Sequence, residues 1–272
     1  MIGDEVHEFE AKSLISIMCN LKTTHYRFGF TGTIDEGKTN GLTLTGLFGP
    51  VRKIITSKEL IERGLAAPFR VKAIVLHYPD AACRLISSAK TRHNYREEVD
   101  WLVANSKRNE FIRNLALSLR GNTFVFYRLV GSHGEELYRL IKEGAGPGRP
   151  VFFVSGDVEG EERLEIVSRI EKEKDAIGVV SYGTFSTGMN VINLHNLIAA
   201  HPYKSKNKIL QTIGRGLRKS QNGQTTTLYD ITDDLSWKKS ENTTLQHYRE
   251  RINIYNAEML DYKIYKVALP YD

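Results

Sequence analysis

The sequence predicts an α/β protein in which parallel β-sheets are covered by helices. Short apolar runs rich in Val, Ile and Phe alternate with amphipathic helical patterns between residues 123 and 229. Such runs are typical of parallel strands that are buried on both faces. The composition, with 41% hydrophobic and 26% charged residues, is that of a globular protein, and no apolar run is long enough to cross a membrane. A chain of 272 residues can form one large domain or two ordinary ones.

Residues 1–90 predict the C-terminal part of a first domain. A short helix is expected at residues 13–18 and a buried strand at 26–30. Only Met1-Ile-Gly precedes the acidic pair Asp4-Glu5, which is too little chain for a buried strand. The chain is therefore expected to start in the middle of a domain, so that this first domain is incomplete.

The pattern is looser after this strand. Four glycines between residues 34 and 50 are turn signals. A short helix is expected at residues 57–63 and a strand at 71–77. We place the first domain boundary near residue 90.

Residues 91–236 predict a second, complete α/β domain. Helices are expected at residues 95–104, 106–119, 134–142 and 161–172, and strands at 123–129, 151–154, 176–181, 196–200 and 225–229. Residues 237–272 predict a small C-terminal extension with a helix at 243–258 and an extended segment at 262–269. The two cysteines, Cys19 and Cys83, form no metal-binding or redox pattern, which favours reduced side chains in a cytoplasmic protein.

The segment Gln211-Thr-Ile-Gly-Arg-Gly-Leu-Arg218 predicts a phosphate contact. If it opens a helix, Arg215 and Arg218 lie on one face, because residues three apart are neighbours on a helix. Two guanidinium groups that point the same way suit a polyphosphate. The net charge of +6 also fits a polyanion partner. The alternative is a solvated basic helix end.

An acidic pair such as Asp4-Glu5 fits magnesium chemistry if it follows a parallel strand, because ligands bind at the carboxyl ends of such strands. One carboxylate can hold Mg²⁺ through water while the other orients an attacking water. The alternative is a frayed acidic N-terminus.

Together these stretches resemble the motifs of the superfamily 2 DExH helicases, and of phage recombination helicases among them. Asp4-Glu5-Val6-His7 resembles the DExH box, Thr31-Gly-Thr33 resembles motif III, and Ser181–Asn190 resembles motif V. Gln211, Gly214, Arg215 and Arg218 match the pattern of motif VI. The DExH box, motif III and motif VI in the expected order are far more specific than any one of them, and the resemblance covers essentially the whole chain.

The resemblance implies RecA-like domains with ATP and Mg²⁺ in the cleft between them. Mg²⁺ is then expected near Asp4 and the catalytic water near Glu5. Arg215 and Arg218 are expected to reach the γ-phosphate from the second domain as arginine fingers. His7 is expected to hydrogen-bond the amide of Gln211 across the cleft.

Two further positions are implied at the nucleotide. Gly188 resembles a glycine near the nucleotide, and Asn190 stands where many relatives have an acid. The role of residue 190 in contacting ribose or positioning water is therefore in question.

Nucleic acid is expected to run across the domains, held by phosphate contacts that carry no sequence information. The resemblance places five residues of the second domain in backbone-contacting loops: Arg128, Ser132, His133, Gly156 and Thr187. Each alone also fits a solvated loop residue.

The phosphate-binding loop G-x-x-x-x-G-K-[S/T] of these enzymes is not found before the acidic pair. The bare pattern occurs at Gly32–Thr39. We reject it as the phosphate loop, because it follows the DExH box and because Asp35 and Glu36 would put carboxylates where phosphates must bind.

The sequence therefore predicts the C-terminal part of an ATP-dependent DNA helicase in a phage-infected host cell. The implied activity unwinds or branch-migrates DNA junctions and displaces RNA from R-loops in recombination and repair. The chain is expected to be inactive or weak alone and to need a partner that carries the phosphate loop. Two alternatives stay open: a non-catalytic nucleic-acid-binding module, and a nucleotide-binding kinase that uses Gly32–Thr39.

Overall fold

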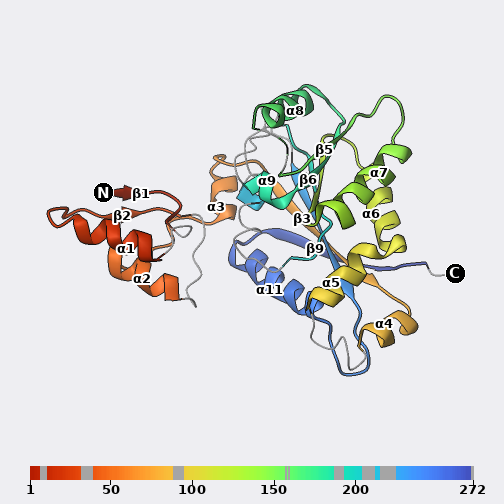
Figure 1. Ribbon diagram of the computed structural model, residues 1–272, viewed down its shortest axis with the longest axis horizontal. Coiled ribbons are helices and arrows are strands. Elements are labelled where there is room, and N and C mark those ends of the chain that lie inside the picture. Colours follow the sequence, from red (N-terminus) through yellow and green to blue (C-terminus); the bar gives the residue numbers. More distant parts are fainter. Residues whose placement is uncertain are drawn as a thin grey trace.

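The computed structural model describes two sheets of very different size. Its described residues are 1–6, 11–31, 39–87, 95–156, 158, 160–186, 193–203, 212–214 and 225–270. A two-stranded sheet lies at the N-terminal end, and a seven-stranded sheet forms the main body (Figure 1). In these ranges no helix combines the length and apolar character that a membrane span requires.

The N-terminal unit packs two helices on one face of its small sheet. Strand β1 (Ile2–Gly3) pairs in parallel with β2 (Phe28–Gly29), and α1 (Ala11–Asn20) and α2 (Thr39–Phe48) complete the unit. Gly29 lies against the Phe48 ring, where an added Cβ would come within 3.0 Å of a ring carbon. The absence of a side chain on this face lets α2 approach the sheet closely.

The prediction that residues 26–30 form a buried strand is wrong. The side chains of Tyr26, Phe28 and Phe30 are 77%, 53% and 56% exposed. Side chains alternate along a strand, so these three share the face opposite to the one that α2 covers. Ile2, the register partner of Phe28, is also exposed.

The large sheet is entirely parallel, in the order β5-β6-β4-β7-β8-β3-β9. Its strands are β3 (Phe69–His77), β4 (Thr123–Tyr127), β5 (Val151–Val154), β6 (Ile177–Ser181), β7 (Asn196–Ala199), β8 (Thr226–Asp234) and β9 (Asp261–Ala268). The other helices are α3 (Ser57–Glu62), α4 (Asp80–Ile86), α5 (Tyr95–Ala104), α6 (Ser106–Ser118), the π-helical turn η2 (Val130–Gly134), α7 (Glu135–Gly144), α8 (Gly160–Lys172), α9 (Tyr182–Ser186) and α11 (Thr243–Ala257).

Helices cover both faces of this sheet, as predicted. On one face, Phe124 belongs to a buried cluster that includes Ile170 of α8 and Tyr255 of α11. On the other, Val125 belongs to a second buried cluster that includes Ile112 of α6 and residues of α4 and α7. The alternation of β4 side chains between two apolar cores explains why this strand reads as a continuous apolar run.

The domain boundaries predicted at residues 90 and 236 do not follow the sheet. Strand β3 lies before residue 90, yet it pairs with β8 and β9, with Val71 opposite Leu228 and Tyr262. Strand β9 lies in the predicted extension and is a full member of the same sheet. The order of residues along the chain did not reveal these pairings, because the partners are far apart in sequence.

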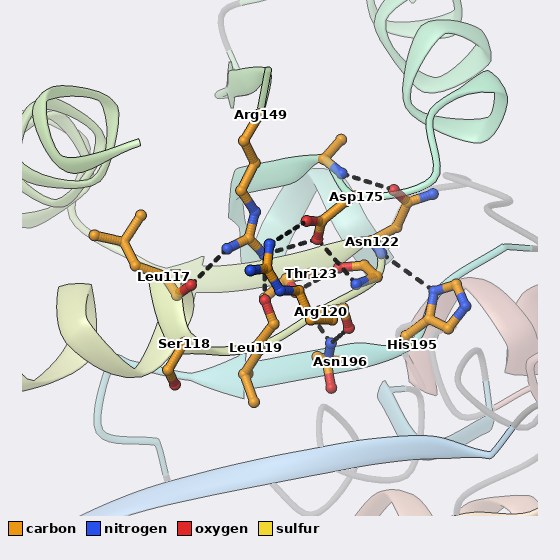
Figure 2. Close-up of polar contacts among 12 residues, drawn as sticks. Leu117, Ser118, Leu119, Arg120, Asn122, Thr123, Arg149, Asp175, His195 and Asn196 are labelled. Atoms are coloured by element: carbon orange, nitrogen blue, oxygen red, sulfur yellow. Dashed lines mark hydrogen bonds and ion pairs between the residues drawn. The ribbon is translucent and has the colours of Figure 1, made fainter. Parts of the chain in front are cut away.

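A polar cluster ties together the amino-terminal ends of the strands (Figure 2). Arg149 donates to the carbonyls of Leu117 and Leu119 at the end of α6, at 2.7 and 2.6 Å, and forms an ion pair with Asp175. The Asn122 side-chain amide donates to the carbonyl of Ile170 in the last turn of α8 and to the carbonyls of Glu173 and Asn193 in neighbouring loops. These bonds satisfy a helix terminus and buried loop carbonyls, so this edge is held by internal contacts.

Candidate functional site

The strand order predicts a ligand-binding site at the carboxyl ends of β4 and β7. These two strands are neighbours, but the chain leaves β4 toward β5 on one side and leaves β7 toward β8 on the other. Ligands of open parallel sheets bind where the connections diverge in this way. Two residues of the predicted nucleic-acid contact set lie in this region with exposed positions, Arg128 after β4 and Ser132 in η2. A third, Gly156, is exposed after β5 at the edge of the sheet.

Tyr95 and His247 lie at the same edge. The Tyr95 hydroxyl donates to the carbonyl of Pro202 at 3.3 Å, and the two rings of Tyr95 and His247 meet edge-on with centroids 5.0 Å apart. Burial raises the pKa of Tyr95, and the nearby charge of Arg128 only partly opposes it. Tyr95 therefore remains a neutral hydroxyl beside an exposed cation.

His133 does not fit its predicted contact with nucleic acid. Its side chain is 0% exposed, and neither ring nitrogen has a hydrogen-bond partner among the described residues. Burial and the nearby Arg108 charge hold the pKa of His133 well below its usual range. The π-helical turn directs Ser132 outward and His133 inward, so a surface role assigned to both is wrong for the second.

A buried ion pair lies beneath this edge. Arg108 of α6 contacts Asp233 of β8 with two hydrogen bonds of 2.9 and 3.1 Å, and Tyr78 donates to the same carboxylate at 2.7 Å. Both charged side chains are fully buried. The geometry is the bidentate arrangement that makes such pairs strong and directional.

A second buried pair joins α11 to β8. Arg251 contacts Asp230 at 2.9 Å, and the Tyr255 hydroxyl donates to the same carboxylate oxygen at 2.8 Å. Arg251 also donates to the carbonyl of Tyr203 at 3.0 Å. This arrangement fixes the backbone at residue 203, from which the chain continues toward the segment that contains Gln211.

The start of the predicted motif V is well defined. The Ser181 hydroxyl accepts from the Thr184 backbone N–H at 3.1 Å and hydrogen-bonds the Thr184 hydroxyl at 2.7 Å. The Tyr182 ring lies 5.2 Å from that of Tyr203. Burial raises the pKa of Tyr182 well above its usual value. The segments that follow β6 and β7 thus contain aromatic residues that adjoin each other.

The acidic pair lies at the carboxyl end of β1, next to the end of β2. Asp4 and Glu5 are both exposed, and Asp4 Oδ1 accepts the Glu5 backbone N–H at 2.9 Å. The Val6 N–H donates to the Phe30 carbonyl at 3.2 Å, which places the pair beside Thr31. In the described ranges no group of three or more acidic, His or Cys side chains could form a metal site by itself. Two exposed carboxylates still suit Mg²⁺, which is held by one or two carboxylates together with waters and phosphates.

Several predicted site residues lie outside the described ranges: His7, Thr187, Gly188, Asn190, Gln211, Arg215 and Arg218. Motif VI is described only at residues 212–214, where Thr212 and Ile213 are buried and Gly214 is exposed. The pattern Gly32–Thr39 is described only at its end, where Thr39 begins α2.

The buried pairs were not predicted from the sequence. The signal was present in β8, a largely buried strand that contains the carboxylates Asp230 and Asp233. A buried carboxylate requires a partner, but the sequence alone did not show that Arg108 and Arg251 supply it.

The family comparison matches the helicase conserved C-terminal domain to residues 106–220. The chain is 37% identical over 282 aligned residues to the ATP-dependent DNA helicase UvsW of Enterobacteria phage T4, covering 99% of this chain and 55% of that protein. It therefore spans about half the length of this relative.

Solved structures support the same fold. The crystal structure of T4 UvsW matches with a TM-score of 0.62 and 33% identity, covering 99% of this chain and 54% of that one. A fragment of a putative HsdR subunit of a type I restriction enzyme from Vibrio vulnificus YJ016 matches with a TM-score of 0.66 and 17% identity, covering 98% of this chain and 47% of that one. The predicted RecA-like parallel sheet with flanking helices is confirmed.

Proposed function

We infer that this chain, which belongs to the superfamily 2 helicases, is the C-terminal part of an ATP-dependent helicase that acts on DNA. The observation that carries this proposal is the 37% identity to T4 UvsW, a DNA helicase, along 99% of the chain. The structure supports it because the exposed polar residues Arg128 and Ser132 follow β4 at the carboxyl edge where a parallel sheet binds ligands.

In the proposed mechanism, ATP binds between the N-terminal unit and the large sheet. Asp4 would hold Mg²⁺ and Glu5 would orient the attacking water, a division that fits two adjacent exposed carboxylates. The bound Mg²⁺ would neutralise charge on the phosphates. Arg215 and Arg218 stabilise the negative charge that develops on the γ-phosphate.

Other residues complete the nucleotide site in this proposal. His7 bonds the Gln211 amide and so links the acidic motif to motif VI. Gly188 allows close approach of the nucleotide, and Asn190 offers an amide where relatives carry an acid. Arg251 helps to position this site, because it donates a hydrogen bond to the Tyr203 carbonyl at the start of the segment that leads to Gln211.

Nucleic acid is proposed to cross the carboxyl edge of the large sheet. Arg128, Ser132 and Gly156 supply an exposed cation, hydroxyl and backbone there, and Thr187 joins them from motif V. Contacts of this kind grip phosphates without reading sequence. The proposed substrates are branched or single-stranded DNA and RNA–DNA hybrids, processed in phage recombination and repair inside the infected cell.

The motor needs a phosphate-binding loop, which we propose is supplied by a further α/β segment that packs against the small sheet. The exposed face formed by Ile2, Tyr26, Phe28 and Phe30 supports this. Parallel sheets are normally covered on both faces, whereas α1 and α2 cover one. The segment can belong to a longer chain or to a separate one.

The test is ATP turnover by the 272-residue chain with and without branched DNA, and again with a polypeptide that carries the phosphate-loop segment. Turnover should appear only in the complete mixture and should rise with DNA. Arg218→Ala should lower it by about 10³-fold or more, whereas Arg169→Ala, on the exposed side of α8, should leave it unchanged.

The remaining outcomes discriminate between the alternatives. Turnover by the chain alone would contradict the need for a phosphate-loop segment. No turnover in any mixture, with DNA binding intact, would favour a non-catalytic binding module. Turnover lost in Lys38→Ala would revive Gly32–Thr39 as the phosphate loop.

A further inference from the structure

A basic corner lies on one face of the large sheet, far from the carboxyl edge. It consists of Arg70 and Lys72 of β3 with Lys263 and Tyr265 of β9. Lys72 is the register partner of Lys263, and Ile74 is that of Tyr265. Partners in a parallel sheet point to the same side, and so do residues two apart on one strand. The four side chains therefore share one face.

The helices that cover this face do not reach the corner. Farther along β3, Ile74 and Leu76 on the same face are buried in the core beneath α4 and α6. At the corner, Arg70 and Lys263 are exposed and the Tyr265 ring is 41% exposed. The open part of the sheet is thus the amino-terminal half of β3 and its neighbour β9.

The positive charge of the corner is largely uncompensated. In the described part of the chain, Arg70, Lys72 and Lys263 form no ion pair with a carboxylate, although Asp261 lies beside Arg70 in register. Lys72 instead places its ammonium 5.3 Å from the centre of the Tyr229 ring. By contrast, the exposed Arg139 on α7 is paired with two glutamates.

Protection of a sheet edge does not explain this arrangement. Lysines on edge strands prevent unwanted pairing with other strands, which accounts for Lys263 on the edge strand β9. Arg70 and Lys72 lie on β3, which is already paired on both sides. Two cations on an interior strand gain nothing from edge protection, and they are placed on a face open to solvent.

We propose that this corner binds single-stranded nucleic acid, with the three cations on successive phosphates and Tyr265 stacked on a base. Residues two apart on a strand are about 6.6 Å apart and neighbouring strands about 4.8 Å, spacings that suit the phosphates of an extended strand. A cationic track beside an exposed aromatic ring is the usual way to hold single strands without sequence preference.

The corner is a second nucleic-acid site, and its role rests on the proposed function. Arg70 is about 23 Å along β3 from His77 at the carboxyl end, seven residues at roughly 3.3 Å each. A strand bound here is not the one gripped by Arg128, so it would be a separated strand or a second arm of a branched substrate. Binding at the corner requires no ATP.

The experiment is titration of a fluorescently labelled single-stranded oligonucleotide by anisotropy, without nucleotide, at several salt concentrations. The variant Arg70→Gln/Lys72→Gln/Lys263→Gln is compared with Lys172→Gln/Lys238→Gln/Lys239→Gln, which removes the same charge elsewhere. Each lost phosphate contact lowers the slope of log K against log salt by about 0.7 for single strands. The corner variant should therefore have a slope shallower by about 2, and the control variant should not.

Tyr265 provides a second measurement that does not depend on charge. Tyr265→Ala should weaken binding about five-fold or more, and Tyr265→Phe, which keeps the ring, should restore it. Equal slopes in the corner and control variants, or no difference between Ala and Phe at position 265, would overturn the proposal. A preference of the corner for duplex over single strands would also overturn it.

Arg128→Gln separates this proposal from the proposed function. Loss of DNA-stimulated ATP turnover in the complete mixture measures DNA contact at the carboxyl edge. The slope of log K against log salt measures phosphate contacts at the corner. If Arg128→Gln leaves turnover unchanged and the corner variant still changes the slope, the proposed path at the carboxyl edge fails and the corner stands. Melting curves of all variants confirm folding, because every substituted side chain at the corner is at the surface or half-buried.

Discussion

Replacement of Arg251 by methionine tests how firmly α11 is built into the large sheet. Arg251 is 1% exposed and its partner Asp230 is 0% exposed. Although burial disfavours its charge, Asp230 keeps the pKa of Arg251 above its usual value. Arg251→Met leaves the buried carboxylate with only the Tyr255 hydroxyl as a hydrogen-bond donor among the described residues.

The expected cost follows from that uncompensated charge. Removal of one partner from a buried pair lowers the free energy of unfolding by about 3–5 kcal/mol. At roughly 2–4 °C per kcal/mol for a protein of this size, the melting temperature should fall by about 6–20 °C. Circular dichroism or scanning calorimetry measures this directly. The double variant Asp230→Asn/Arg251→Met should recover part of the loss, because the buried charge is gone.

Arg249 is the matched control on the same helix. Its guanidinium also contacts a carboxylate, Glu241, but its side chain is 67% exposed. Exposed pairs contribute roughly 0–1 kcal/mol, so Arg249→Met should shift the melting temperature by no more than a few degrees. Equal shifts for Arg249→Met and Arg251→Met would refute the assignment of a buried, uncompensated Asp230.

Three further changes test other parts of the structure. Burial lowers the pKa of His133, so below about pH 6.5 the unfolded chain binds more protons than the folded one. The free energy of unfolding should therefore fall as the pH drops through that value. His133→Leu should flatten this part of a plot of melting temperature against pH, and an unchanged plot would contradict the burial of His133. The Glu98 carboxylate accepts hydrogen bonds from two backbone N–H groups at the start of α11, each at 2.8 Å. Glu98→Gln should therefore lower the free energy of unfolding, measured by urea titration, by about 1–2 kcal/mol. An equal loss for Glu97→Gln, at an exposed position, would refute the capping role of Glu98. Gly121 has φ +84°, and a Cβ added there would lie 2.6 Å from the His195 ring. In the same titration, Gly121→Ala should lower the free energy of unfolding by more than about 1 kcal/mol. Gly146→Ala, where an added Cβ meets open space, is the control and should not.

The strands β4 to β8 could be predicted because each carries its own signal. Thr123–Tyr127 is buried at every position, and a run of apolar residues without alternation is the mark of a strand covered on both faces. The family could be predicted because its motifs depend on a few residues at fixed spacing. Neither inference required knowledge of which strands are neighbours.

The features that were missed depend on pairing or packing. The helix α2 contains Gly41 and Gly46, which predicted turns, yet its packing on the small sheet overrides that propensity. His133 is buried because η2 has a π-helical turn, a geometry with no sequence signature. The apolar run at residues 26–30 is exposed because a buried strand needs a layer on each side, and the run itself says nothing about that layer.

The place of β3 in the sheet constrains the order in which the protein can fold during synthesis. β3 is made before its neighbours β8 and β9, which begin at residues 226 and 261. Val71 therefore has to wait for partners more than 150 residues later on the chain. Contacts of such long range are slow to form, and an apolar strand exposed in the meantime invites aggregation. The nascent chain can assemble β4 to β7 on the ribosome, but the sheet is complete only once β9 has emerged.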